Sequence, residues 1–147
     1  MNRQIDNFRT LIVLSLAALA VAVYVSYRAE PPPAELQDLY GWVGYGAVIP
    51  GLVDERLWYL WLALTCMGLL GSFFFIASAR YLLIIPMFLA PLRAGLGGIW
   101  VSSPLEDAFW SFNYIFSTFV IGMAFFHEPI VVRFRKVATR SRLADDL

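Results

Sequence analysis

Four long hydrophobic stretches, separated by short polar segments, dominate the pattern of positions along this chain. They predict helical membrane spans at about 10–28, 56–79, 81–100 and 104–132. About 20 apolar residues suffice to cross the hydrocarbon core, and backbone groups in lipid must find hydrogen-bond partners within their own segment. The sequence therefore predicts an all-α polytopic membrane protein. Residues 1–147 are expected to form a single membrane domain, a compact bundle of four transmembrane helices.

The third and fourth stretches carry signals that shape their helices. Pro86 and Pro91 each remove a helical hydrogen bond, so the third helix is expected to be kinked or broken. Ser103 and Glu106 have the spacing of a capping box at the start of the fourth helix. Pro129 is expected to kink the last turn of that helix without ending it.

Composition and charge agree with a membrane setting and give it a direction. Hydrophobic residues make up 60% of the chain and charged residues 15%, against about 25% in average soluble domains. Four spans put both termini on one side, which then holds eight of the 11 basic residues. The positive-inside rule makes that side cytoplasmic, with a basic tail at 133–147 and an external loop at 29–55. The eight residues are Arg3, Arg9, Arg80, Arg133, Arg135, Lys136, Arg140 and Arg142.

The first stretch has a second interpretation as a cleavable secretory signal. A basic start and an apolar run precede Ala20, Val21 and Ala22, which resemble a cleavage site. The apolar run continues to Val25, which favours a retained helix. Both alternatives stay open.

Aromatic residues gather at the predicted external ends of the spans and in the external loop. Trp and Tyr favour the membrane–water interface because their apolar rings carry one polar group. An interfacial belt normally has two rims, so this one-sided weighting predicts an external interaction face. That face comprises Tyr40, Trp42, Tyr45, Trp58, Trp61, Trp100 and Trp110.

Three pairs of small residues, each four positions apart, predict close helix–helix packing. Together with several polar residues in the spans they favour a compact bundle, although such pairs are common in membrane helices and indicate no particular function. The pairs are Ala18 with Ala22, Gly68 with Ser72, and Thr118 with Gly122, and the polar residues are Ser15, Ser78, Ser111, Asn113 and Ser117.

Arg93 is predicted in or near the membrane, where an arginine needs a carboxylate, carbonyl or phosphate partner. Glu106 and Asp107 begin the next span, so the three side chains are candidates for an outward-facing pocket that binds a ligand or anion. The alternative is an arginine that snorkels to the interface beside two carboxylates that complement a helix dipole.

The basic tail is expected to bind anionic lipid as well as to fix the topology. A patch this short, held at a membrane, does not suit nucleic acid. The lipid-binding residues are Arg133, Arg135, Lys136, Arg140 and Arg142.

No set of residues in the sequence has a catalytic or metal-binding signature. The chain has one cysteine, Cys66, and one histidine, His127, which are too few for a usual zinc site. His127 and Glu128 are adjacent, and adjacent helical residues point about 100° apart. We therefore expect no enzymatic activity, no metal and no cofactor.

Residues 80–134 carry short motifs that resemble the C-terminal half of small, uncharacterised four-span bacterial membrane proteins. A mid-helix Asp-Gly pair of those proteins is missing, since Gly122 follows Ile121 here. The resemblance covers about a third of the chain; it implies a location in the bacterial inner (plasma) membrane and no particular activity. The motifs are Val101-Ser102-Ser103-Pro104-Leu105-Glu106 at the start of the last helix and Phe126-His127-Glu128-Pro129 at its end.

These observations favour a non-enzymatic protein that acts by association through its external aromatic face. An accessory subunit, an assembly factor and an immunity-type protector are the functions of this class, with a membrane-protein partner or a second copy of the chain. The alternative is a minimal oligomeric carrier, or a lipid- or anion-binding protein, that uses Arg93 at the broken third span.

Overall fold

The computed structural model describes residues 2–28, 51–97 and 104–145, and every regular element in these ranges is an α-helix. The expected all-α class is confirmed for them. The helices are α1 (Asn2–Arg28), α3 (Gly51–Phe73), α4 (Ala79–Leu82), α5 (Ile84–Gly97), α6 (Pro104–Phe126) and α7 (Glu128–Asp145). Outside the described residues lie Tyr40, Trp42, Tyr45 and Trp100 of the expected aromatic face, most of the expected loop 29–55, and the side chains of Arg140 and Arg142.

Three helical segments are long and apolar enough to cross a membrane, namely Arg3–Arg28, Val53–Phe73 and Pro104–Phe126. Many large apolar side chains on them, including Leu70 and Phe119, are exposed at the surface of the chain. Such a surface is unfavourable in water and favourable in lipid. These features support the predicted membrane protein.

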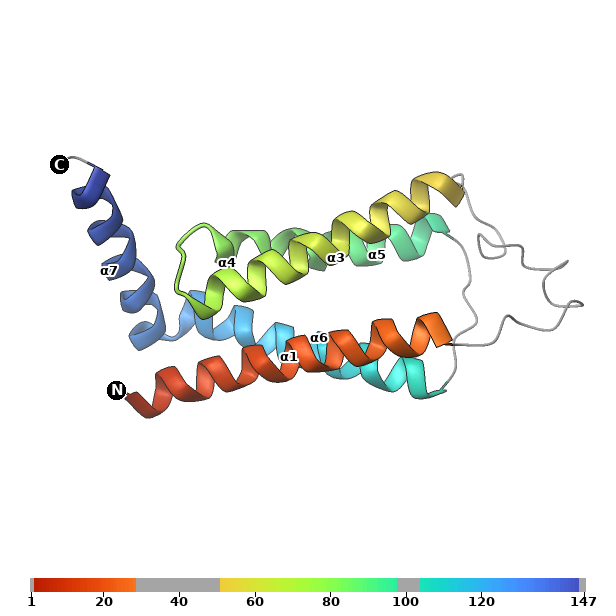
Figure 1. Cartoon of the computed structure of the whole chain (residues 1–147), viewed down its shortest axis with the longest axis horizontal. Helices are drawn as coiled ribbons and strands as arrows, with labels where there is room; N and C mark the ends of the chain where they lie inside the picture. Colours follow the sequence, from red (N-terminus) through yellow and green to blue (C-terminus); the bar gives the residue numbers. More distant parts are fainter. Residues whose placement is uncertain (1, 29–50, 98–103, 146–147) are drawn as a thin grey trace, which may run out of the picture.

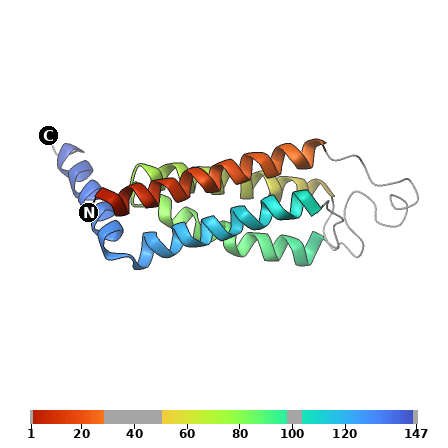
Figure 2. The ribbon, with the colours of Figure 1, turned by 90° about the horizontal axis from the view of Figure 1, so that it is seen from below.

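The helices run alternately in opposite directions along one long axis (Figures 1 and 2). α1 lies along α6, and α3 lies along α4 and α5. The two groups also contact each other, and α7 crosses the end of the molecule at which α1 begins. The start of α1 and the end of α7 therefore lie at the same end of the molecule (Figure 1).

The turn at residues 74–78 corrects the expected end of the second span, which we placed at 79. Helix α3 ends at Phe73 in a Schellman motif, in which Ile76 N–H donates to Gly71 O at 2.9 Å and Phe75 N–H to Ser72 O at 3.0 Å. Phe75 takes the left-handed conformation, with φ of 59°, that glycine usually supplies at this position. Its buried ring offsets this strain by packing on Phe8 at 5.7 Å between ring centroids.

A single residue, Leu83, separates α4 from α5, and Pro86 explains the interruption. Pro86 has no N–H to donate to the carbonyl of Leu82, so one bond of the helical ladder cannot form. Leu83 keeps right-handed helical dihedral angles of φ −72° and ψ −23°. The chain therefore continues in one general direction through α4 and α5 (Figure 1).

The last expected span is also corrected, because α6 ends at Phe126 and a separate helix follows it. His127 O accepts hydrogen bonds from Ile130 N–H at 2.9 Å and Val131 N–H at 3.0 Å, which places His127 at the N-cap of α7. Pro129 thus occupies the first turn of α7, where a missing N–H costs nothing. A proline that we expected to kink one helix instead lies at the start of a new one, which changes direction (Figure 1).

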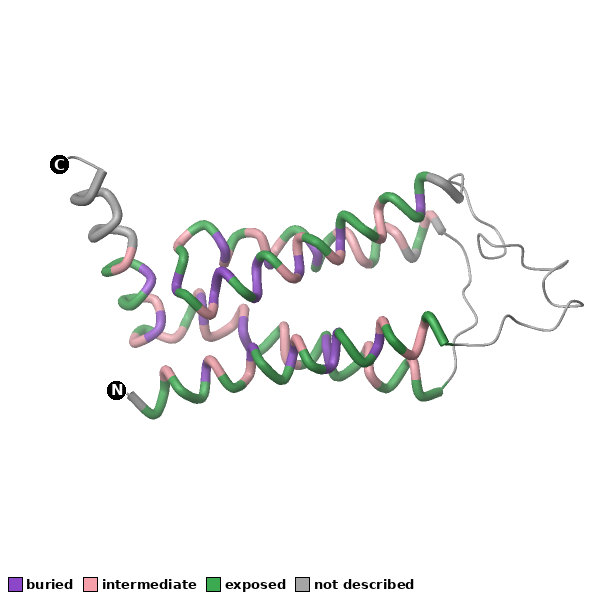
Figure 3. Tube along the Cα trace, viewed as in Figure 1, coloured by how far each residue is buried: buried purple, intermediate pink, exposed green. Residues whose placement is uncertain are grey.

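The core lies mainly between the helix pairs near the end that α7 crosses. Figure 3 shows buried positions on the facing sides of the helices and exposed positions on their outer sides. The side chain of Phe134 in α7 is fully buried and packs edge-on against Phe8 of α1 and Phe75, which fixes α7 to the bundle. The buried cluster comprises Phe8, Ile12, Leu69, Phe75, Leu83, Val120, Ala124, Ile130 and Phe134.

Candidate functional site

A bidentate ion pair joins α3 to α5 near the end opposite α7. Arg93 Nε donates to Asp54 Oδ1 at 2.8 Å, and Arg93 Nη2 donates to Asp54 Oδ2 at 2.9 Å. This bidentate geometry is the strongest arrangement for an arginine–carboxylate pair. Asp54 is only 4% exposed, so the pair is shielded from solvent on the acid side. Sequence reasoning missed Asp54 because it belongs to the segment expected as external loop.

Glu106 lies at the start of α6, where it connects that helix to the end of α1. Ser26 Oγ donates to Glu106 Oε1 at 2.5 Å, and Trp110 Nε1 donates to the same oxygen at 3.4 Å. Asp107 follows Glu106 in the first turn and is exposed. The bidentate partner of Arg93 is Asp54. The expected grouping of Arg93 with Glu106 and Asp107 stays a prediction.

A polar clasp of three buried or half-buried side chains holds α1 against α6. Asn113 Nδ2 donates to Ser15 O at 3.0 Å and to Ser15 Oγ at 3.2 Å, while the Oγ atoms of Ser15 and Ser117 lie 2.7 Å apart. Ser15 and Asn113 are almost fully buried. In an apolar environment such contacts satisfy polar groups that would otherwise be costly.

Replacing Asn113 with alanine is expected to destabilise the protein by about 1–2 kcal/mol, because two interhelical hydrogen bonds are lost and a small void remains. The measurement is the free energy of unfolding in mixed micelles, followed by tryptophan fluorescence. Asn7→Ala on exposed α1 surface is the matched control and should be nearly neutral. Equal stability of the two variants would show that the clasp does not stabilise the protein.

The aromatic residues of the expected external face have different environments. Trp61 was expected on the external interaction face. Its side chain is instead only 6% exposed and lies between helices. Its ring packs on Trp110 of α6, with centroids 5.5 Å apart, and on Tyr114, with centroids 6.3 Å apart. Trp58 is half-buried beside Tyr59. The ring contacts of Trp61 join α3 to α6, which are far apart in the sequence.

Two of the three small-residue pairs are used for packing within the chain. Ala18 and Ala22 are buried on α1, which lies along α6. Gly68 and Ser72 are buried on α3, and a Cβ added at Gly68 would lie 2.6 Å from Leu83 Cδ2. The burial of these four residues agrees with their predicted role in close helix packing.

The third pair, Thr118 with Gly122, faces outward from α6. Thr118 is exposed, and a Cβ added at Gly122 would meet no described atom within 4 Å beyond its own helix. Thr118 Oγ1 donates to Tyr114 O at 2.8 Å, so its hydroxyl is satisfied within the helix. This pair is therefore not used for packing among the described residues.

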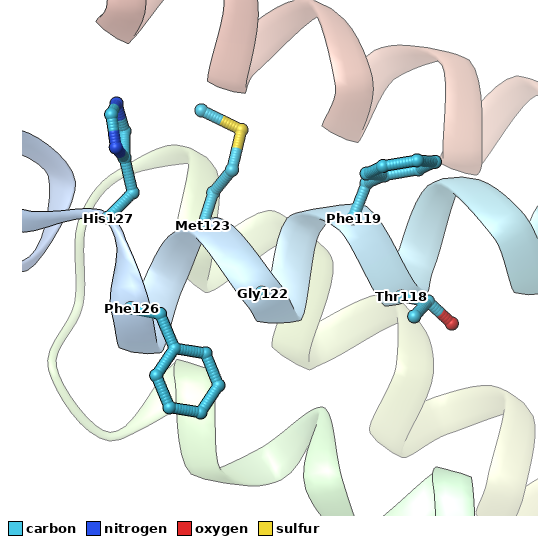
Figure 4. A pocket seen from close by; sticks show the side chains of 6 residues that line it. All are labelled: Thr118, Phe119, Gly122, Met123, Phe126 and His127. Atoms are coloured by element: carbon cyan, nitrogen blue, oxygen red, sulfur yellow. The ribbon is translucent and has the colours of Figure 1, made fainter.

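Two open hollows border these residues. The larger, of about 440 Å³, lies on α6 and is shown in Figure 4, where Met123 and His127 extend to one side of the helix and Phe126 to the other. A second, of about 310 Å³, lies between α5 and α6, and Thr118 lines both. Neither is lined by Arg93. The larger is formed by Thr118, Phe119, Gly122, Met123, Phe126 and His127, the second by Met87, Ala90, Pro91, Tyr114, Ser117 and Thr118.

The basic residues of the expected tail belong to helix α7. Arg133, Arg135 and Lys136 are exposed on either side of the buried Phe134. Within residues 2–28, 51–97 and 104–145, no three His, Cys, Asp or Glu side chains gather where they could hold a metal ion. The absence of a metal or cofactor in the protein stays a prediction.

Comparison with protein families, with curated proteins and with solved structures finds no match to this chain.

Proposed function

We propose that this chain is a four-span integral membrane protein that acts by binding another membrane protein, not by catalysing a reaction. The three long apolar helices supply three spans. The interrupted helix α4–α5, over residues 79–97, supplies the fourth, at roughly 28 Å for 1.5 Å per residue. That length is close to the hydrocarbon thickness of about 30 Å.

The distribution of basic residues supports an orientation with both termini in the cytoplasm. Arg3, Arg80 and the basic residues of α7 lie toward the end that holds both termini, while Arg28, Arg56 and Arg93 belong to the other end. Cytoplasmic segments are enriched in Lys and Arg. The resemblance of 101–106 and 126–129 to small bacterial membrane proteins supports a bacterial inner membrane as the proposed location.

The observation that carries the proposal is the outward-facing pair of Thr118 and Gly122. The other two small-residue pairs are already buried within the chain, whereas this one borders two open hollows. Small residues on a membrane helix let a second backbone approach closely. In the apolar window of α6 only 17% of residues are buried, against 33% in α1, so α6 is the least buried of the three long apolar helices.

The occupant that fits this surface is a transmembrane helix of a partner protein. The hollow between α5 and α6 has small residues, Ala90, Ser117 and Thr118, on both walls. A helix seated there would pack against α5 and α6 together. An accessory subunit or assembly factor needs such a lateral surface, and the aromatic residues of the expected external loop would add contacts outside the membrane.

Replacing Gly122 with leucine is expected to weaken partner binding about tenfold or more, because the side chain fills the space that a second helix would occupy. The variant should still fold, since no described atom obstructs its Cβ. The measurement is recovery of cross-linked partner from native membranes with a photo-reactive residue at position 118, compared between Gly122→Leu and the unaltered chain.

Ala20→Leu is the matched control, because Ala20 is a small, exposed residue of α1 and lines neither hollow. It should leave cross-linking unchanged. Equal cross-linking in Gly122→Leu and Ala20→Leu, with both variants folded, would contradict binding at this face. A cross-linked product of twice the chain mass would identify the partner as a second copy.

The alternative of a carrier or anion-binding protein that uses Arg93 receives less support. The guanidinium of Arg93 is held by Asp54 in two hydrogen bonds, which neutralises its charge within the chain. A ligand anion would have to compete with that carboxylate for the charge of Arg93. A structural role for Arg93 explains the same geometry without a ligand.

A further inference from the structure

Two arginines flank one aromatic cluster at the end of the bundle that α7 crosses. The guanidinium carbon of Arg9, in α1, lies 5.0 Å from the ring centroid of Phe73 and 5.5 Å from that of Phe75. The guanidinium carbon of Arg80, in α4, lies 5.2 Å from the ring of Phe125 and 5.8 Å from that of Phe134. The rings of Phe75 and Phe134 are themselves in contact at 5.3 Å, so the two arginines belong to one cluster.

Neither arginine has a carboxylate partner among the described residues. The Nε atoms of Arg9 and Arg80 are buried and have no hydrogen-bond acceptor there. Arg80 Nη2 donates to Tyr81 Oη at 3.0 Å, which is a neutral acceptor on the adjacent residue. By contrast, Arg93 at the other end has both a buried carboxylate and bidentate geometry.

Aromatic rings satisfy an arginine incompletely. A ring attracts the positive face of the guanidinium, but the five N–H donors lie in the guanidinium plane and require acceptors. A buried donor without an acceptor is costly, and a charge near lipid without a counter-ion more so. Phosphate oxygens suit arginine best, since they accept two parallel N–H bonds and supply negative charge.

Helix α7 adds positive charge around the same cluster. Ile130 and Phe134 are fully buried and fix the first turns of α7 against the bundle, so the helix crosses its end (Figure 1). Arg133, Arg135 and Lys136 of α7 are exposed there. A helix fixed in this way places its basic side chains at the level of lipid headgroups.

We propose that Arg9 and Arg80 form a binding site for phosphate, supplied by the headgroup of an anionic phospholipid in the leaflet at this end. The aromatic cluster excludes water from one side of each guanidinium, and the basic residues of α7 attract the anion. This site is separate from the partner-binding face at Gly122, and its test does not depend on that proposal.

The test compares lipid retention by the full chain and by Arg→Gln variants. The unaltered chain, Arg9→Gln, Arg80→Gln and the double variant are purified in mild detergent with equal amounts of phosphatidylglycerol and phosphatidylcholine, and retained lipid is measured by native mass spectrometry. We expect the chain to prefer phosphatidylglycerol and the double variant to retain it about tenfold less well, since each basic residue at a membrane surface contributes to anionic-lipid binding.

Arg28→Gln is the matched control. Arg28 also lies over an aromatic ring, that of Tyr24 at 5.6 Å, but at the opposite end of α1. It should retain phosphatidylglycerol like the unaltered chain. A loss in Arg28→Gln equal to that in the double variant would overturn the proposal, because it would reflect total charge and not this site.

Two further measurements identify the source of the anion and control for misfolding of the variants. Stabilisation of the chain by inorganic phosphate in phosphatidylcholine nanodiscs, absent in the double variant, would support the site with free phosphate as its ligand. Arg9→Lys with Arg80→Lys keeps the charges and should keep most of the preference for phosphatidylglycerol. No lipid preference and no response to phosphate in the unaltered chain would overturn the proposal without any variant.

Discussion

Replacing Asp54 with alanine is expected to destabilise the protein by about 3 kcal/mol. The change leaves the guanidinium of Arg93 without the carboxylate that holds it in two hydrogen bonds of 2.8 and 2.9 Å. Removing one partner of a buried ion pair costs about 3–5 kcal/mol, and the low end applies because the Arg93 side chain is 24% exposed. The measurement is the free energy of unfolding in mixed micelles, followed by helical circular dichroism.

Three further variants separate the effect of this ion pair from general effects of charge. Arg93→Ala should cost a similar amount, because Asp54 is the more deeply buried partner. Asp54→Leu combined with Arg93→Leu should recover much of the loss, since two apolar residues leave no unpaired charge. The control is Glu55→Ala, one position further on an exposed side of α3. If Asp54→Ala costs no more than Glu55→Ala, the pair does not hold α3 to α5.

Replacing Gly71 with alanine is expected to destabilise the protein by about 3 kcal/mol, as much as replacing Asp54. An added Cβ would lie 2.5 Å from Ala79 Cβ, and both carbons are fixed to the backbone, so the α3–α4 hairpin has to open. The measurement is again the unfolding free energy. Gly95→Ala is the contrasting variant and should stabilise slightly, by up to about 1 kcal/mol, because alanine favours a helix and nothing obstructs it.

The close approach at Gly71 has a direct rescue. Ala79→Gly removes the opposing carbon, so the double variant Gly71→Ala with Ala79→Gly should regain most of the lost stability. Gly68→Ala should fall between the two glycine variants, since the nearest atoms there belong to the Leu83 side chain, which can move. Failure of Ala79→Gly to rescue Gly71→Ala would show that the loss has another origin.

Hydrophobic length alone predicted the three long apolar helices, because a helix is the only structure that satisfies a long apolar backbone within its own segment. The start of α6 at Pro104 also agrees with the expected one. The helix ends at Phe73 and Phe126 were not predicted. Each depends on the conformation of a few residues, and the apolar composition continues across both turns.

The candidate sites, like the helices, could be predicted from the sequence only in part. Arg93 could be identified from the sequence as a charge that requires a partner, because it interrupts an apolar stretch. Its partner Asp54 was missed because it belongs to the expected external loop, and helix packing brings its carboxylate within hydrogen-bond distance of Arg93. The small-residue pairs were equivalent in sequence, and their environments separated Thr118 and Gly122 from the others.

The sequence by itself determined that the chain is helical and suited to lipid, and it identified the small and charged residues available for contacts. Those properties follow from local composition and from the hydrogen-bonding needs of the backbone. Only the tertiary structure decided which contacts form: Asp54 with Arg93, Asn113 with Ser15, and two arginines around one cluster of phenylalanine rings. The physical reason is that these groups are far apart along the chain, and their distances depend on how whole helices pack.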